Sequence, residues 1–395
     1  MWRRTVSESS MTDKLFGLHD GHQAASKLVP VGSYRLWDVG VTWLDLETSP
    51  GVFNFTHLDS LVAEANSLGA SVTLVLGRNP SFYAATKAEC PPYTNFEDYV
   101  RAVMTRYKGK IDSYQVWNES NIATFWAGTQ AQMAVLTDIV WRVRNEVDPA
   151  ALVVAPSGPV RKKYQLTAYK QYLDALDTSH VDAYAFSMYP LPYSEHGPED
   201  FYDLLGTVKD MLAEYGQQDK PLWVSEINYG VGSSTYTSGL TDLLDDTTQA
   251  ANVIKTYALA KAGGIERCFW YRWDLASQPD DAGIYRTIAD TVMMKPWQSG
   301  HPLTDISLSS GGAAFSMAQD WLAGKVVRFR IDANGTYKIK LRHSGKVRWI
   351  YWNPTKGVHI KVAPRVRRTT CMGKTAVVTD GNIWVTSNPV LVEIL

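Results

Sequence analysis

The chain has 395 residues, with 39 basic and 40 acidic side chains that leave a formal net charge of -1. This balance, without a stripe of Lys and Arg, argues against a nucleic-acid-binding protein, which needs clustered positive charge to neutralise phosphates. No apolar run reaches the roughly 18 residues of a membrane-spanning helix, and the charged N-terminus lacks the apolar stretch of a signal peptide, so we expect a soluble protein without membrane insertion.

Short apolar runs in residues 1–324 predict β-strands that alternate with helices. In chain order the strands are expected at 15–19, 33–39, 71–76, 113–117, 152–156, 183–188, 222–226 and 267–271. The clearest helices are expected at 58–68, 96–107, 130–147, 248–262 and 313–322, and Gly or Pro follows most of them closely. Eight strands alternating with helices predict an α/β fold of the (β/α)8 type, the TIM barrel. An open doubly wound sheet competes with it, but no Gly-rich phosphate loop follows the first strand.

The pattern changes after residue 324, where residues 325–395 predict a small C-terminal all-β domain resembling a sandwich. Its short strands are expected at 326–331, 336–341, 347–352, 358–362, 375–378 and 390–394. Turn signals separate them, among them Asn334-Gly335 and Asp380-Gly381. A module of this size is too small for a full free-standing sandwich, so we expect it to pack on the barrel.

Two glutamates end predicted strands of the barrel. Glu119 follows the fourth strand and Glu226 ends the seventh, and barrel enzymes carry their chemistry at the C-terminal ends of the strands. Two carboxylates across one cleft are what retaining glycoside hydrolysis requires, one as proton donor and one as nucleophile. Asn118 is placed to bond a sugar 2-hydroxyl, and Arg35 to keep a nucleophilic carboxylate charged. A lone Glu at a strand end is most often a solvated loop residue, so the prediction depends on the pair.

Other residues are candidates for substrate contact rather than chemistry. Sugar rings stack on flat aromatic side chains, and Trp43 and Trp126 lie in predicted loops, although core packing is the alternative for each. His19 follows the first strand and is a candidate for a sugar-hydroxyl contact or a plain loop residue. It lacks the further ligands of a metal site, and no metal is expected. The three cysteines fit no disulfide framework, but a single disulfide stays open.

These motifs resemble a known group of enzymes. Trp117-Asn118-Glu119 and Ser225-Glu226 are similar to the motifs of clan A glycoside hydrolases, the retaining barrels with catalytic glutamates on strands four and seven. The segment Gly51-Val52-Phe53-Asn54-Phe55 resembles the one that follows the second strand in that clan. The layout is most similar to glycoside hydrolase family 39, including its endo-acting exopolysaccharide hydrolases.

The resemblance implies roles for individual residues. Glu119 would be the acid/base and Glu226 the nucleophile, with Asn118 on the 2-hydroxyl and Arg35 supporting the nucleophile. Tyr189, at the end of the sixth strand, would hydrogen-bond the nucleophile. Trp270 or Trp273, at or after the eighth strand, would form the floor of the subsite that holds the cleaved sugar. One position departs from the family, because Ser187 stands where a His is common.

We therefore expect a retaining glycoside hydrolase without a cofactor, endo-acting on an oligo- or polysaccharide and monomeric. An exo-acting β-xylosidase or α-L-glycosidase is the rival with the same chemistry. A non-catalytic carbohydrate-binding barrel is the rival from another class. The compartment stays open between extracellular or virion-associated action and the cytoplasm.

Overall fold

A computed structural model describes residues 13–19, 29–190, 197–229, 245–271 and 310–395. Its centre is a barrel of eight parallel strands: β1 (Phe16–Leu18), β2 (Ser33–Leu36), β5 (Ser71–Val75), β6 (Ser113–Gln115), β7 (Leu152–Val154), β8 (Tyr184–Ser187), β9 (Leu222–Ile227) and β10 (Arg267–Trp270). Each strand pairs with its neighbours in chain order, and β10 returns to pair with β1. Two bridges, Val154 to Ala183 and Pro159 to Ser187, join the β7 and β8 segments and close the ring. The predicted barrel is confirmed, and all eight expected strands are present.

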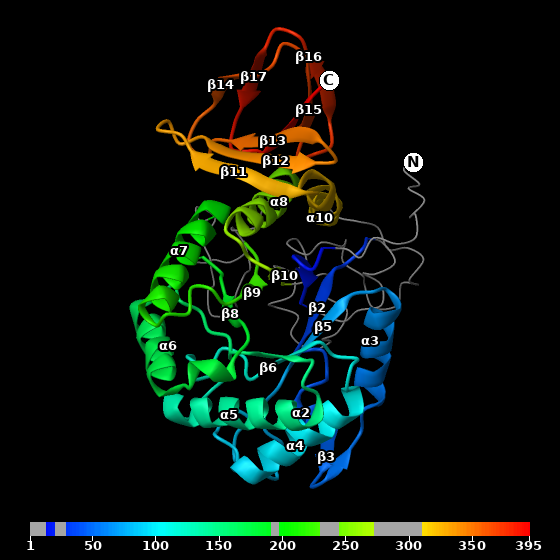
Figure 1. Cartoon of the computed structure of the whole chain (residues 1–395), viewed down its shortest axis with the longest axis vertical. Helices are drawn as coiled ribbons and strands as arrows, with labels where there is room; N and C mark the ends of the chain where they lie inside the picture. The colour runs from blue at the N-terminus through cyan, green and yellow to red at the C-terminus, as the bar shows by residue number, and fades with distance from the viewer. Residues whose placement is uncertain (1–12, 20–28, 191–196, 230–244, 272–309) are drawn as a thin grey trace.

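Helices follow the strands and surround the barrel (Figure 1). They are α3 (Thr56–Ser67), α4 (Tyr93–Tyr107), α5 (Gln130–Val147), α6 (Lys163–Ala175), α7 (Pro198–Glu214), α8 (Asp246–Ala262) and α10 (Ser310–Trp321). A short helix α2 (Trp43–Leu46) and the hairpin of β3 (Glu47–Ser49) and β4 (Val52–Phe53) lie between β2 and α3, and a 3-10 turn η1 (Thr178–His180) precedes β8. Local sequence fixes several helix starts. The side chain of Thr129 caps α5, and Gln132 bonds back to the Thr129 backbone.

Polar side chains lie in layers inside the barrel, next to a buried apolar cluster that includes Trp223 and Phe269. Near the N-terminal ends of the strands, the Arg267 guanidinium donates to Thr73 Oγ1 and Ser113 Oγ at 3.2 Å each. Successive inward-facing residues of a strand are two apart, so Gln115 lies one layer above Ser113. There it meets Arg35 of β2. The interior therefore carries side-chain hydrogen bonds from the bottom of the barrel up to the mouth.

The C-terminal residues form a six-stranded antiparallel sheet of β11 (Lys325–Ile331), β12 (Tyr337–His343), β13 (Lys346–Trp352), β18 (Val390–Ile394), β15 (Val366–Thr370) and β16 (Thr375–Val378). A separate pair joins β14 (Val358–Lys361) to β17 (Asn382–Val385). The large sheet lies against α8 and α10 (Figure 1), and one apolar core runs from the barrel into it. An all-β C-terminal part is thus confirmed, whereas the boundary at residue 324 and the sandwich arrangement stay predictions.

Two expectations concern features of the whole chain. None of the helices in the described part is both long and apolar enough to cross a membrane. All three cysteines lie in described segments and are free, so the disulfide left open by the sequence is not formed.

Candidate active site

Glu119 lies just past β6 in an unusual backbone conformation. Its φ is +44°, in the left-handed region that non-glycine residues rarely adopt, and its N–H donates to Ser157 Oγ at 2.9 Å. The preceding Trp117 is fully buried, and its ring covers Gly77 so closely that a Cβ there would come within 2.6 Å of it. The strand, the packed indole and the Ser157 bond together hold a locally strained residue, as is common at active sites.

Glu226 lies where β9 bulges. Phe186 of β8 pairs with Val224, but the next residue, Ser187, pairs with Glu226, so Ser225 is extra. The pairing with β10 shifts by one residue in the same stretch. A bulge re-aims the side chains next to it. At the barrel mouth Glu226 is buried except for 8% of its surface, which stays exposed.

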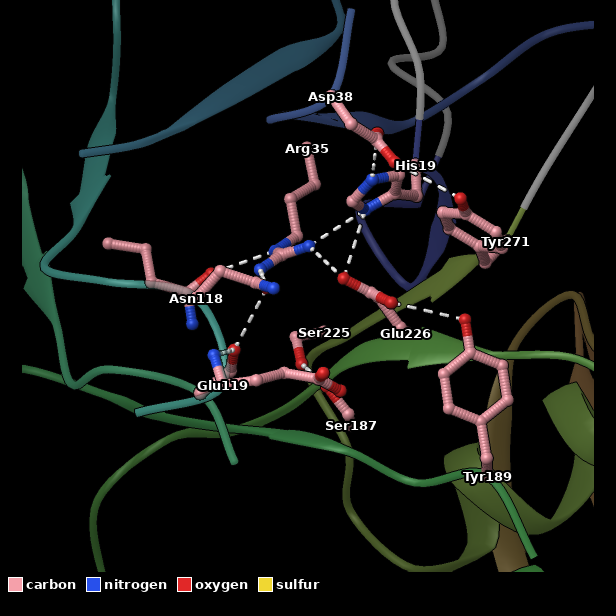
Figure 2. Close-up of polar contacts among 12 residues, drawn as sticks. His19, Arg35, Asp38, Asn118, Glu119, Ser187, Tyr189, Ser225, Glu226 and Tyr271 are labelled. Carbon is pink, nitrogen blue, oxygen red and sulfur yellow. Dashed lines mark hydrogen bonds and ion pairs between the residues drawn. The ribbon is translucent and has the colours of Figure 1, made fainter. Parts of the chain in front are cut away.

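Arg35 joins the two strand ends (Figure 2). Its guanidinium donates to Glu226 Oε1, to Asn118 Oδ1 and to Gln115 Oε1, each at 2.7 Å. The side chain is completely buried, so its fork of donors has one fixed geometry. The sequence-predicted pairing of Arg35 with Glu226 is therefore present in the structure, with Asn118 on the same guanidinium.

His19 and Asp38 extend this network. Arg35 Nη1 lies 2.7 Å from His19 Nδ1, and since a guanidinium only donates, that ring nitrogen accepts. The ring proton is then on Nε2, which donates to Asp38 Oδ1 at 2.7 Å. Tyr271 donates to the other Asp38 oxygen at 3.0 Å. His19 thus connects to the arginine that holds Glu226, and its Nδ1 lies 3.7 Å from Glu226 Oε1.

Tyr189 contacts Glu226, whereas Ser187 contacts Glu119. Tyr189 donates to Glu226 Oε2 at 3.1 Å, and burial raises the pKa of Tyr189 well above its ordinary value, so the hydroxyl keeps its proton. Ser187, where a His was expected from the resemblance, hydrogen-bonds Glu119 and lies 3.3 Å from Ser225 Oγ. Glu226 therefore receives donors from Arg35 and Tyr189, which stabilise negative charge on it.

Glu119 has the opposite electrostatic environment. Burial, and next the negative charge of Glu226, raise the pKa of Glu119 to about 7. The hydrogen bond from Ser187 and the charges of Arg35 and Arg161 act in the other direction. Glu119 is accordingly protonated below neutral pH while a carboxylate held by two donors lies nearby. This division into a proton donor and an anion is the one that acid-assisted displacement needs.

The aromatic residues that were predicted to contact the substrate lie in different surroundings. Trp270 is buried at the end of β10, and its indole N–H has no partner in the described part of the chain. Trp43 stacks on Tyr99 in the core, and Trp126 packs edge-on against Trp117. Both are almost fully buried and their indole N–H groups are already bonded, so the structure does not bring them to the glutamates. Trp273 lies outside the described residues.

Several residues of the network were not singled out from the sequence. These are Gln115, Ser157, Asp38 and Tyr271, together with the nearby cation Arg161. Their positions at or just past strands β2, β6, β7 and β10 were an available signal, because all strand ends of a parallel barrel meet at one mouth. The described residues contain no group of His, Cys, Asp and Glu that could hold a metal ion.

Comparison of the sequence with family models and with curated proteins finds no match. Solved structures are similar in fold. A family 39 glycoside hydrolase from the gut symbiont Bacteroides cellulosilyticus WH2 has a TM-score of 0.72 at 15% identity, over 96% of this chain and 80% of that one. A glucosidase from Croceicoccus marinus has a TM-score of 0.68 at 15% identity, over 97% and 96% of the two chains.

A GH30 endoxylanase from Clostridium papyrosolvens C71 matches with a TM-score of 0.58 at 14% identity, over 96% of each chain. The resemblance to clan A glycoside hydrolases, family 39 among them, is confirmed for the fold. These similarities extend through the C-terminal sheet as well as the barrel, since they cover nearly the whole chain.

Proposed function

We propose that the chain is a retaining glycoside hydrolase, with Glu119 as acid/base and Glu226 as nucleophile. The observation that carries this proposal is the contrast between two neighbouring carboxyl groups at the barrel mouth. Glu119 is buried with a pKa raised to about 7, and Glu226 is held by Arg35 and Tyr189. The fold shared with structures titled as a glycoside hydrolase, a glucosidase and an endoxylanase supports the same class of reaction.

In the first step the Glu226 carboxylate attacks the anomeric carbon while the bond to the leaving oxygen breaks. Glu119 gives its proton to that oxygen, and Glu226 becomes an ester of the sugar. Esterification removes the negative charge of Glu226, which is one of the causes that raise the pKa of Glu119. The pKa of Glu119 then falls, and its carboxylate becomes ready to act as a base.

In the second step Glu119 takes a proton from water as the water oxygen attacks the anomeric carbon, and the ester bond to Glu226 breaks. Both carboxyl groups return to their starting states, so the two displacements together retain the anomeric configuration. Asn118 is held by Arg35 and presents its amide N–H to the sugar 2-hydroxyl in this scheme. We also propose an endo mode, for which the exposed Phe82 in the loop after β5 offers an additional stacking surface.

The test is a glycan library screened for reducing-end release with wild type, Glu119→Gln and Glu226→Gln. Each variant should lose roughly a thousandfold or more in kcat, as removal of a group that acts in the transition state does. Proton NMR of the first-formed product should show the substrate's anomeric configuration. Oligomers as early products support the endo mode, whereas monosaccharide alone would favour the exo rival.

Wild type and both variants equally inert on the whole library would contradict the proposal. Sugar binding by all three proteins would then favour the non-catalytic carbohydrate-binding barrel. An inverted product would leave a glycosidase but exclude attack by Glu226.

A further inference from the structure

Three consecutive cations, Arg161, Lys162 and Lys163, end the loop after β7 and begin α6 at the barrel mouth. Lys162 is the N-cap of α6, and the first turn of this helix has no acidic residue. No carboxylate in the described part of the chain lies within ion-pair distance of any of the three. A helix N-terminus is itself positive, so cations there are unfavourable unless an anion compensates them.

The course of the loop brings Arg161 near enough to Glu119 for its positive charge to lower the pKa of that carboxyl group. Pro159 bridges to Ser187 of β8, and the Ser187 hydroxyl bonds Glu119. Two residues further along, Arg161 Nη1 makes one long hydrogen bond, 3.5 Å, to the carbonyl of Pro190. The guanidinium is thus placed on the β7 and β8 side of Glu119.

The Arg161 guanidinium makes few hydrogen bonds within the described part of the protein. Its Nε is buried without a hydrogen-bond partner among the described residues, although a guanidinium offers five donors. Arg144 and Arg267 also have a buried Nε without a partner among the described residues, but each of them is paired with an aspartate. Arg142 makes two short bonds to Glu97 on the outer helices. A buried donor without a partner costs free energy that a bound acceptor would recover.

We propose that Arg161 binds the carboxylate of a uronic acid in the leaving-group half of the substrate, which makes the substrate an acidic polysaccharide. This inference rests on the proposed function. Glu119 protonates the leaving oxygen, so a group near Glu119 meets the leaving sugar. β7 is the neighbour of β6, which carries Glu119, whereas Glu226 is two strands away on β9. A guanidinium fork matches a carboxylate in geometry and charge, and Lys162 and Lys163 extend the positive field toward a polyanion.

The experiment uses pairs of polymers that differ only in the carboxyl group. Glucuronoxylan and a panel of glucuronate-containing bacterial polysaccharides are offered native and after chemical reduction of the uronates to neutral sugars. Wild type should cleave a native polymer with a kcat/KM roughly ten- to a hundredfold above that of its reduced form. The sugar that leaves becomes the new non-reducing end, and mass spectrometry should find a uronate there.

Variants connect the preference to one side chain. Arg161→Gln should bring the native-to-reduced ratio of kcat/KM close to one, and Arg161→Lys, which keeps charge but loses the fork, should lower it severalfold. Lys361→Gln removes one exposed positive charge from β14 and should leave the ratio unchanged. Circular dichroism checks the fold, and if Arg161→Gln is unfolded, the ratio for Arg161→Lys decides.

Each result has a defined meaning. A wild type that cleaves reduced polymers as well as native ones, or an Arg161→Gln variant that keeps the preference, overturns the role of Arg161 and leaves a glycosidase. No cleavage of any native or reduced polymer, nor of the neutral glycan library, overturns both the inference and the proposed function.

Discussion

At the scale of single residues, the two glutamates differ because the chain supplies them with different neighbours. Glu226 takes donors from Arg35 and Tyr189, while Glu119 has Ser187 as its side-chain donor in the part of the chain that the structure describes. The negative charge of Glu226 adds to burial in holding a proton on Glu119. Two identical side chains thereby acquire the different protonation states that a donor and a nucleophile need.

The protonation of Glu119 predicts the alkaline limb of the pH profile. The pKa of its free carboxyl group is raised to about 7, so the competent protonated form predominates below that pH and disappears above it. We expect kcat/KM to fall about tenfold per pH unit above neutrality. A rate profile on the best substrate checks this, and Glu119→Gln, whose residual activity has no such proton to lose, is the control. An alkaline limb shared by both proteins would assign it to another group.

A second prediction concerns Asp38, which acts on Glu226 through His19 and Arg35. It fixes the proton of His19 on Nε2, and this leaves Nδ1 free to accept from Arg35. In Asp38→Asn the amide can turn its N–H₂ toward the ring and reverse that tautomer, so Arg35 loses an acceptor and shifts. We expect kcat to fall roughly ten- to a hundredfold, because small misplacements of catalytic groups are costly. Steady-state kinetics with thermal melts checks this, and Tyr271→Phe, which keeps the Asp38 carboxylate, should cost less. An equal loss in both variants would mean that the tautomer does not matter.

At the scale of elements, the strand ends aim the side chains. The extra residue in β9 turns Glu226 relative to both β8 and β10. Glu119, just past the end of β6, itself adopts the left-handed backbone conformation. Its N–H donates to Ser157 Oγ, from the loop after β7. Both devices place strain or irregularity next to the chemistry and leave regular pairing below it.

The packing of Trp117 on Gly77 predicts a sensitive position. Gly77 has φ +118°, and an added Cβ would lie 2.6 Å from the indole ring, so Gly77→Ala must displace Trp117 and with it Glu119. We expect about 2 kcal/mol or more of lost stability together with a lower kcat. Denaturant unfolding and kinetics check both. Gly216→Ala is the matched control, since its φ of +68° carries backbone strain but its Cβ meets open space. A catalytic loss of equal size in the control would refute the contact with Trp117 as the cause.

The sequence predicts the helices and strands better than it predicts the placement of individual side chains. Short apolar runs located all eight barrel strands, because the strands carry buried apolar residues even where other positions are polar, as in β2 and β6. β15 and β17 were not predicted, and β15 is rich in Arg and Thr. The pairing of Arg35 with Glu226 was predicted from the chemistry of the two side chains and from the resemblance. The bulge in β9 and the left-handed Glu119 were not, since each depends on pairing and packing with distant strands. Trp43 and Trp126 show the same limit, because Trp43 begins the short helix α2 instead of lying in a loop, and both rings are buried.

At the scale of the whole molecule, the barrel and the C-terminal sheet share one hydrophobic core. It passes from the strands through α8 and α10 to Ile339, Leu341 and Trp352 of the sheet. At the same junction Tyr202 of α7 meets Phe329 of β11 edge to face, with ring centres 5.2 Å apart. The face of the sheet that packs on α8 and α10 belongs to the same hydrophobic core as the barrel. We therefore expect the two parts to unfold together.

The last prediction tests that junction through its buried ion pair. Lys255 of α8 donates to Glu199 of α7 at 3.0 Å, and the Trp352 indole of β13 donates to the same carboxylate at 2.7 Å. Lys255→Met leaves the carboxylate partly buried without its cation, which should cost about 3 kcal/mol and lower the temperature of a single calorimetric transition. The double variant Lys255→Met with Glu199→Gln removes the unpaired charge but keeps an acceptor for Trp352, so it should recover most of that loss. A double variant as unstable as the single one would show that packing of the Lys255 stem, and not its charge, holds the junction. Two separated transitions in the single variant would show instead that the ion pair, rather than the shared core, couples the sheet to the barrel.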